Sequence, residues 1–151
     1  MCKTTLILKK INKIGAEYMW GTKNSRDKNI EKTVHEILKS RARSRIYVYL
    51  LRKNGARTEE IIKGTKLHPS TVRETLSKMY EQELIFRRKI KNDNIGKNPY
   101  IFYPIPPIEL LKRYANEIED RLNKLATLTS REKDRNFKPV KIKIHERADK
   151  I

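Results

Sequence analysis

The chain has 151 residues, of which 37% are hydrophobic, so it has room for one modest core with extensions but not for two full domains. It carries 36 lysines and arginines against 18 aspartates and glutamates, a net charge of +18. This excess is larger than solubility requires and indicates a polyanionic partner, with nucleic acid as the first candidate. A lysine-rich composition that accompanies growth at high temperature is the alternative origin of the charge.

The positive charge is spread along the whole chain. Residues 1–42 carry 10 basic and 4 acidic side chains, residues 43–106 carry 14 and 6, and residues 107–151 carry 12 and 8. The middle segment has the largest excess, which assigns the charge to a central module and not to a detachable tail.

Cysteine usage and hydropathy bear on the compartment. Cys2 is the single cysteine, which excludes an internal disulfide and a cysteine-based zinc finger and suits a reducing cytoplasm. The apolar run at 6–8 is interrupted at once by Lys9 and Lys10, and no stretch has the length of a membrane span. The sequence therefore predicts a cytoplasmic protein without a membrane segment.

Residues 1–29 are predicted to be an N-terminal extension. Apolar residues recur there at helical spacing, although the segment 4–8 could equally begin a strand; the helical set is Ile7, Ile11, Ile14 and Tyr18. The polar segment 21–29 predicts a loop.

Three helices are expected next. The first has an apolar face that ends around 40–43; its residues are Ile30, Val34, Ile37 and Leu38. Ser44 is the expected N-cap of the second, which should stop at the left-handed pair Asn54 and Gly55. Thr58 is then the expected N-cap of a helix of about two turns, with Glu59 and Glu60 opposing the helix dipole.

A further helix is predicted over 69–82, because Pro69 follows His68 at the position where a helix tolerates proline. Val72, Leu76 and Met79 form its apolar stripe. The opposite side is polar and includes Ser70, Thr71, Arg73, Glu74, Ser77 and Lys78.

This polar side has the chemistry of a helix that reads the major groove of DNA. The groove is about 12 Å wide and admits one helix, whose N-terminal residues reach base edges. Arg73 is the candidate for a bidentate contact to guanine, whereas Lys78, a turn later, is expected to meet phosphate. An ordinary solvated helix face is the alternative interpretation.

A basic β-hairpin is predicted after this helix, with strands in 84–90 and 100–103 and a polar, Gly-containing loop between them. Residues 86–102 of this hairpin would form a wing, and its cations suit a wing that lies along a phosphate backbone. They are Arg87, Arg88, Lys89, Lys91 and Lys97.

These segments together resemble the archaeal winged helix-turn-helix transcriptional regulators of the TrmB type, with the MarR and ArsR families more distant. The sequence of 49–55 is similar to the end of their first helix, and 58–62 with 67–76 is similar to their helix-turn-recognition-helix core. Residues 83–85 resemble the segment that leads into the wing, and 100–106 resemble the TrmB-type strand and its proline-containing exit.

The resemblance covers roughly residues 30–128. It implies a mainly α fold with a small β-hairpin (α+β), in which a winged helix-turn-helix DNA-binding domain over 30–106 is followed by a long C-terminal dimerisation helix over 107–129. Two departures stand out. These proteins often have glycine in the turn before the recognition helix, whereas this chain has Thr65 and Lys66 there, with Gly64 just upstream. Only 45 residues follow Pro106, so no sugar-sensing effector domain or cofactor is implied.

The segment 107–129 also carries a heptad seam of almost three heptads, which favours helix pairing over folding back on its own domain. The seam consists of Ile108, Leu111, Ala115, Ile118, Leu122 and Leu125. Parallel and antiparallel pairing remain open.

In residues 130–151, Val140, Ile142 and Ile144 alternate with basic residues, which fits either a short strand or a disordered basic tail.

The sequence gives little support for an enzyme or a metal site, because His35, His68 and His145 are scattered and no carboxylate pair or Gly-rich phosphate loop accompanies them. We therefore expect a homodimeric, sequence-specific regulator of transcription that binds double-stranded DNA. The competing interpretation is a winged-helix protein that binds without reading sequence, such as an architectural or chromatin factor, an RNA binder, or a basal component that recruits the transcription machinery.

Overall fold

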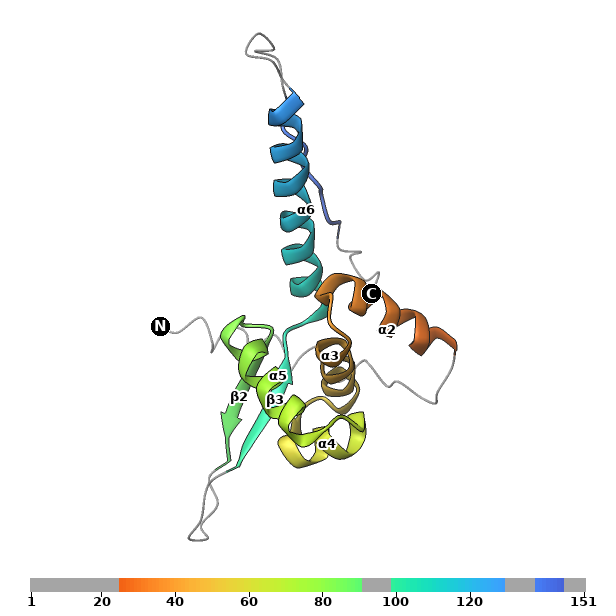
Figure 1. Ribbon diagram of the computed structural model, residues 1–151, viewed down its shortest axis with the longest axis vertical. Helices are drawn as coiled ribbons and strands as arrows, with labels where there is room; N and C mark the ends of the chain where they lie inside the picture. The colour runs from red at the N-terminus through yellow and green to blue at the C-terminus, as the bar shows by residue number, and fades with distance from the viewer. Residues whose placement is uncertain (1–24, 91–98, 130–137, 146–151) are drawn as a thin grey trace, which may run out of the picture. The chain divides into compact units, whose positions relative to one another are not determined.

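The computed structural model describes residues 25–90, 99–129 and 138–145. The chain divides into two compact units, Met1–Pro106 and Pro107–Ile151. The first contains four helices and three short strands among its described residues, and the second contains one long helix (Figure 1). The predicted fold class, a mainly α winged helix-turn-helix with a small antiparallel sheet and a C-terminal helix, is confirmed.

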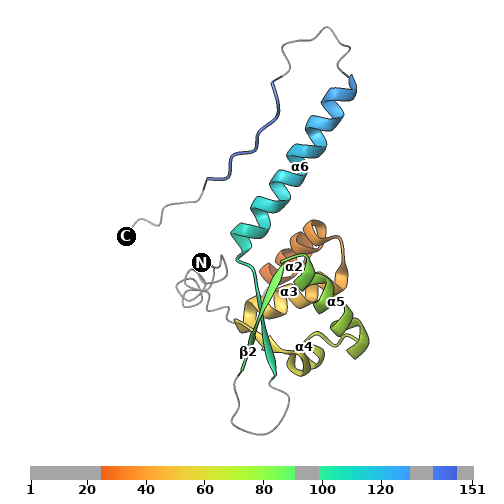
Figure 2. The same cartoon turned by 90° about the vertical axis from the view of Figure 1, so that its left-hand side faces the viewer.

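The central helix of the first unit is α3, Arg41–Lys53. Four elements pack against it: α2 (Ser25–Leu38), α4 (Thr58–Thr65), α5 (Pro69–Glu81) and β3 (Tyr100–Pro104) (Figures 1 and 2). Val34 and Leu38 of the first predicted helix and the predicted apolar stripe of α5 are in the core of this unit, whereas Ile30 and Ile37 are half-buried. The most deeply buried side chains of the core are Ile46, Tyr47, Leu50, Ile61, Val72, Met79 and Ile85.

Two predicted helix starts and one predicted loop differ from the structure. Ser40 is the N-cap of α3, because its hydroxyl accepts from the Arg43 N–H at 3.4 Å. Ser44 is a buried residue inside the helix, where its hydroxyl donates to the Ser40 carbonyl at 2.7 Å. The segment predicted as a loop ends earlier than expected, since α2 already begins at Ser25. Polar residues in that first turn carry no apolar periodicity, so the pattern was visible only from Ile30.

The start of α4 is also shifted by one residue. Arg57 is the N-cap, and its backbone N–H donates to the Glu60 carboxylate at 2.7 Å, while Thr58 is the first helical residue. The predicted role of the carboxylates in the first turn holds, since both Glu59 and Glu60 lie there. The helix has eight residues, in keeping with the two turns expected.

The sheet has three strands in the order β1-β3-β2, all antiparallel. The predicted hairpin consists of β2 (Ile85–Lys89) and β3, with Arg87 opposite Phe102. The third strand, β1 (Ala56–Arg57), was not predicted, because two residues after a helix stop carry no alternation. It pairs with β3 on the side away from β2 and so connects the start of α4 to the hairpin.

The second unit contains α6, Pro107–Thr129, whose bounds match the predicted helix. Residues 138–145 lie in no helix or strand. No helix among the described parts of the chain is both long and apolar enough to cross a membrane. The segments 1–24, 91–98, 130–137 and 146–151, which include the predicted N-terminal helix or strand, fall outside the described residues.

Candidate nucleic-acid interface

The polar side of α5 is a solvent-exposed surface opposite a buried stripe. Val72, Leu76 and Met79 are buried as predicted, and Thr75 is buried beside them. The six predicted contact residues lie together on the other side, and all are exposed except Thr71, which is half-buried. We call this surface the reading face; it consists of Ser70, Thr71, Arg73, Glu74, Ser77 and Lys78.

The start of α5 is fixed by its cap. His68 occupies the N-cap and Pro69 the first helical position, as predicted. The Ser70 N–H donates to Nδ1 of His68 at 3.4 Å, and the Ser70 hydroxyl oxygen lies 2.7 Å from the same nitrogen. The first residue of the reading face is therefore held at the helix entrance, where N–H groups without helical partners and the dipole favour an anion.

The charges on the reading face are not equivalent. The Lys78 ammonium donates to the Glu74 carboxylate at 2.6 Å, one helical turn away. The hydrogen bond and the charge of Lys78 lower the pKa of Glu74. Arg73, in contrast, forms no hydrogen bond or ion pair with any described residue. Arg73 is thus the cation of this face that remains available to a partner.

The turn before α5 is built without glycine. Lys66 ends α4 in the left-handed conformation, with φ of 54°. The nearby Gly64 is required for another reason, since a Cβ there would lie 2.0 Å from Cε2 of Tyr49. The glycine therefore permits close packing of α3 on α4, and a lysine takes the strained turn position.

The hairpin divides the predicted wing cations between two faces of the sheet. Arg87 and Lys89 share one face with Phe102 and Tyr100, because residues opposite one another in a ladder point the same way. Arg88 belongs to the other face, which carries the stacked rings of Phe86 and Tyr103 at 5.3 Å.

All three of these cations, Arg87, Arg88 and Lys89, are exposed, whereas Lys91 and Lys97 lie outside the described residues. Sequence reasoning missed the two aromatic neighbours of Arg87. Its guanidinium carbon lies 4.5 Å from the ring centre of Tyr80 and 4.6 Å from that of Tyr100.

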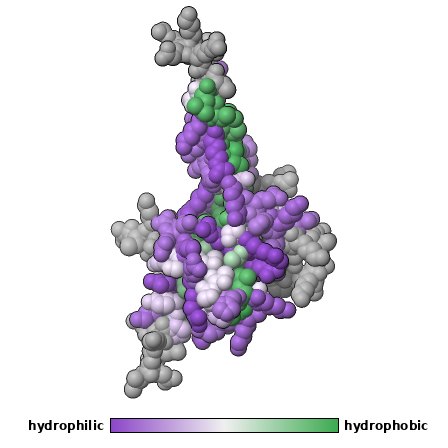
Figure 3. Space-filling view, viewed as in Figure 1, coloured by the Kyte–Doolittle hydropathy of each residue, from purple (hydrophilic) through white to green (hydrophobic). Residues whose placement is uncertain are grey.

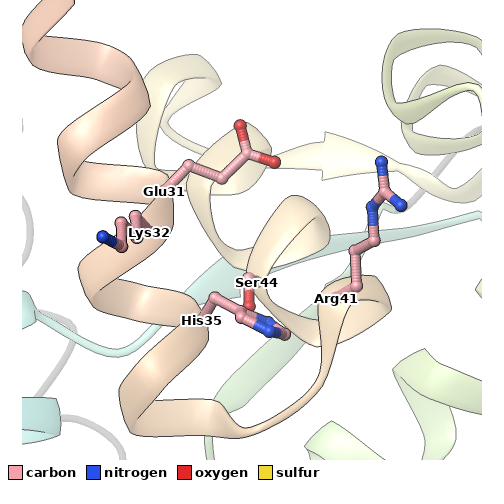
Figure 4. Close-up of a pocket in the computed structure, with 5 residues that line it drawn as sticks. All are labelled: Glu31, Lys32, His35, Arg41 and Ser44. Atoms are coloured by element: carbon pink, nitrogen blue, oxygen red, sulfur yellow. The ribbon is translucent and has the colours of Figure 1, made fainter.

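A shallow cavity of about 310 Å³ lies between α2 and α3 (Figure 4). Glu31, Lys32 and His35 line it from α2, and Arg41 and Ser44 line it from α3. Two of its polar groups are paired within the protein, since Glu31 pairs with Arg45 at 3.6 Å and Ser44 donates to the Ser40 carbonyl at 2.7 Å. Among the described residues, no group of three or more metal-ligating side chains occurs.

The predicted seam lies along α6. Hydrophobic side chains follow this helix as a green stripe in Figure 3. Ala115 is buried and Ile108 and Ile118 are half-buried, but Leu111 and Leu122 are each 42% exposed and Leu125 is 60% exposed. These leucines form an exposed apolar stripe along α6.

Residues 138–145 contact the side of α6 next to the seam. The Asn123 amide bonds both backbone groups of Val140, accepting its N–H at 2.8 Å and donating to its carbonyl at 3.2 Å. The Ile142 N–H donates to the Glu119 carboxylate, one turn earlier. The described part of the predicted strand or tail is thus bound to α6 and forms no strand.

Comparison with known proteins gives a family match for part of the chain. Residues 40–108 match the family described as "Sugar-specific transcriptional regulator TrmB". A solved structure described as a possible transcriptional regulator from Methanosarcina mazei Go1 is 20% identical, with a TM-score of 0.55 over 68% of this chain and 89% of that chain. A search of curated proteins finds no match.

Two further solved structures are less similar. The AntR antimony-specific transcriptional repressor is 14% identical, with a TM-score of 0.42 over 76% of this chain and 95% of its own. MepR, a transcription regulator of the Staphylococcus aureus multidrug efflux pump MepA, is 13% identical, with a TM-score of 0.42 over 87% of both chains.

The helix order, the sheet topology and the family match lead to one assignment. Residues 40–108 form a winged helix-turn-helix of the TrmB type, the DNA-binding domain of a transcriptional regulator.

Proposed function

We propose that this chain is a sequence-specific transcriptional regulator that binds double-stranded DNA as a homodimer. In this proposal α5 enters the major groove and the hairpin of β2 and β3 lies along the phosphate backbone. The match to the TrmB family covers the winged helix alone, so the sugar specificity in the name of that family is not part of the proposal.

The observation that carries the proposal is the exposed reading face of α5, with Arg73 free of partners among the described residues. A helix with one buried and one polar, exposed side fits a groove about 12 Å wide. Arginine is the side chain best suited to bind guanine through two parallel hydrogen bonds. Arg73 lies in the second turn of the helix, within the N-terminal part that reaches base edges in this fold.

The other contact residues take roles that follow from their chemistry. Ser70 and Thr71 lie in the first turn, where hydroxyl and N–H groups meet phosphate or base edges. Ser77, Glu74 and Lys78 lie further along the reading face, and Lys78 is expected at a phosphate. The wing cations are assigned to the phosphate backbone; they are Arg87, Arg88, Lys89, Lys91 and Lys97.

The homodimer is supported by α6. Its seam leucines are exposed in the single chain, Leu122 by 42% and Leu125 by 60%. A second helix packed against this apolar stripe would bury them. A two-fold pair of chains would place two copies of α5 on one side of the duplex. The target would then be a pseudo-palindrome whose half-sites are separated by one helical turn, about 34 to 36 Å, or a multiple of it.

The net charge of +18 favours a second candidate, a winged-helix protein that binds duplex DNA without reading its sequence. The two candidates differ in a measurable quantity. A specific regulator prefers its site by about a thousandfold or more, whereas an architectural protein shows a steep salt dependence with little preference.

Selection of bound fragments from a random pool of duplex DNA, with the full chain at about 0.2 M salt, tests the proposal, because nonspecific phosphate binding weakens at that salt. We expect enrichment of one motif with two inverted half-sites. Enrichment of a single half-site would contradict the dimer. Recovery of unselected sequences with retained affinity would favour the architectural candidate.

A further inference from the structure

Arg87 makes cation–π contacts with two aromatic rings of the winged helix. Its guanidinium carbon lies 4.5 Å from the ring centre of Tyr80, in α5, and 4.6 Å from that of Tyr100, in β3. Both rings are on the surface, with Tyr80 41% and Tyr100 38% exposed. One arginine therefore joins the C-terminal turn of the recognition helix to the wing by contacts with two aromatic rings.

The backbone places these three side chains together. The connection from α5 to β2 is a tight helix ending in which Glu83 adopts a left-handed conformation, with φ of 54°. The Leu84 N–H donates to the Met79 carbonyl at 2.9 Å and the Glu83 N–H to the Tyr80 carbonyl at 3.0 Å, the pair of bonds of a Schellman motif. The chain therefore reverses directly at the end of α5, and β2 returns alongside that helix.

The register of the hairpin completes the arrangement. Arg87 is opposite Phe102, and Tyr100 lies two residues before Phe102 on the same face of the sheet. Diagonal neighbours of this kind are within reach of long and aromatic side chains. Tyr100 therefore meets Arg87 from β3, and Tyr80 meets it from α5.

The geometry has a chemical consequence for the guanidinium group. A cation–π contact uses the charge of the guanidinium group and not its N–H donors, and Arg87 forms no hydrogen bond with a described residue, so its N–H groups remain able to donate. Arg87 forms no ion pair with a carboxylate among the described residues. The stack also restricts the rotamers of a long side chain, which lowers the entropy that the side chain loses when it binds a ligand.

We propose that Tyr80 and Tyr100 are positioning residues that hold the guanidinium edge of Arg87 ready for a DNA phosphate at the junction of α5 and the wing. The inference rests on the proposed function, since it needs a duplex as the ligand. It adds two uncharged residues to the interface and makes Arg87 a preorganised contact, unlike a mobile surface arginine. Its alternative is a purely structural role, in which the stack only fastens the wing to the helix.

The test uses the full chain and a short fluorescent duplex of random sequence, because a phosphate contact does not depend on the bases. Arg87→Ala should weaken binding and reduce the salt slope by about 1, as loss of one phosphate contact requires. Tyr80→Leu and Tyr100→Leu should each weaken binding about two- to fivefold, and Tyr80→Phe and Tyr100→Phe should bind like the unmodified chain.

A double-mutant cycle tests whether the tyrosines act through Arg87. If the tyrosines act through the guanidinium, Tyr80→Leu has no further effect once Arg87 is alanine. An equal loss in both backgrounds would overturn the inference, as would tyrosine-to-leucine variants that fold and bind normally.

Urea denaturation separates positioning from fastening: positioning predicts weaker binding by Tyr80→Leu with an unchanged free energy of unfolding, and a clear fall in that free energy would overturn the inference. Arg87→Lys leaves both tyrosines in place and keeps the positive charge, but it removes the planar guanidinium group. This variant should bind more weakly than the unmodified chain, and equal binding would also overturn the inference.

Failure of the proposed function gives a different result. In that case the unmodified chain does not bind the duplex, whereas normal binding by Arg87→Ala would overturn the inference and leave the proposed function standing. The inference also fails alone when Arg87→Ala weakens binding and the tyrosine variants do not.

Discussion

The hydroxyl of Tyr47 donates a 2.8 Å hydrogen bond to the backbone carbonyl of Ile105, just beyond β3. Tyr47 is 1% exposed and belongs to α3, the central helix. The N–H of Ile105 donates in turn to the Leu84 carbonyl, in the turn after α5, at 3.0 Å. One residue therefore joins the central helix, the end of the recognition helix and the end of the hairpin, which holds the reading face and the wing on a common support.

Tyr47→Phe should lower the free energy of unfolding by about 1 to 3 kcal/mol, because the buried Ile105 carbonyl loses its hydroxyl partner. Urea denaturation measures this change. Tyr80→Phe removes a hydroxyl from an exposed ring and is the matched control, with a change near zero expected. Equal stability of Tyr47→Phe and the unmodified chain would show that the hydrogen bond contributes little.

Alkaline pH should destabilise the domain through the same residue. Burial raises the pKa of Tyr47 well above its usual value. Above pH of about 10 the unfolded chain ionises this tyrosine and the folded chain keeps it protonated, so the unfolded state binds fewer protons and stability falls as pH rises. The stability advantage over Tyr47→Phe should therefore be complete below pH of about 10 and shrink above it. A difference that stays constant to higher pH would contradict this account.

Much of this fold could be predicted from local patterns. Asn54 and Gly55 do end α3 in left-handed conformations, His68 and Pro69 do begin α5, and the seam helix has the expected bounds. These features depend on a few neighbouring residues, whose conformational preferences are strong. The buried stripe of α5 was likewise visible as a helical period, so the exposed reading face followed from it.

The remaining features depend on contacts that the local sequence pattern does not specify. β1 is a strand only because β3 pairs with it, and Ser44 is not a cap because it packs inside α3. The contact between Arg87 and Tyr80 arises from a chain reversal at Glu83, a residue with no special preference for that conformation. The spacing of four residues between Glu74 and Lys78 already permits their ion pair. The side-chain contacts add that Arg73 has no such partner among the described residues, so it is the unpaired cation of the reading face.

Arg73→Ala should weaken binding to the selected site by about 1 to 3 kcal/mol and relax selection at one base pair. Lys89→Ala, on the exposed hairpin, should instead weaken binding to all sequences alike and reduce the salt slope by about 1. Titration of both variants against the selected duplex and a scrambled duplex checks the difference. Equal losses on both duplexes for Arg73→Ala would refute direct readout by this arginine.

Glu74→Gln should increase the affinity for random duplex DNA several-fold. The change removes a negative charge from the reading face and frees the Lys78 ammonium, so the salt slope should become steeper by about 1. Preference for the selected site should stay the same, because random sequences gain as much as the specific one. Glu36→Gln, at an exposed position of α2, changes the net charge equally and controls for it. Unchanged binding by Glu74→Gln would mean that the ion pair does not face the duplex.

Leu122→Glu should convert a dimer into monomers, because it places a charge in the middle of the apolar seam of α6. Leu122 is already 42% exposed in a single chain, so the monomer should keep its stability. Sedimentation velocity gives the oligomeric state, and binding to a two-half-site duplex should weaken in parallel, since each monomer then binds alone. Lys124→Glu introduces the same side chain on the opposite side of the helix and should leave the dimer intact. A sedimentation profile unchanged by Leu122→Glu would refute the assignment of the seam.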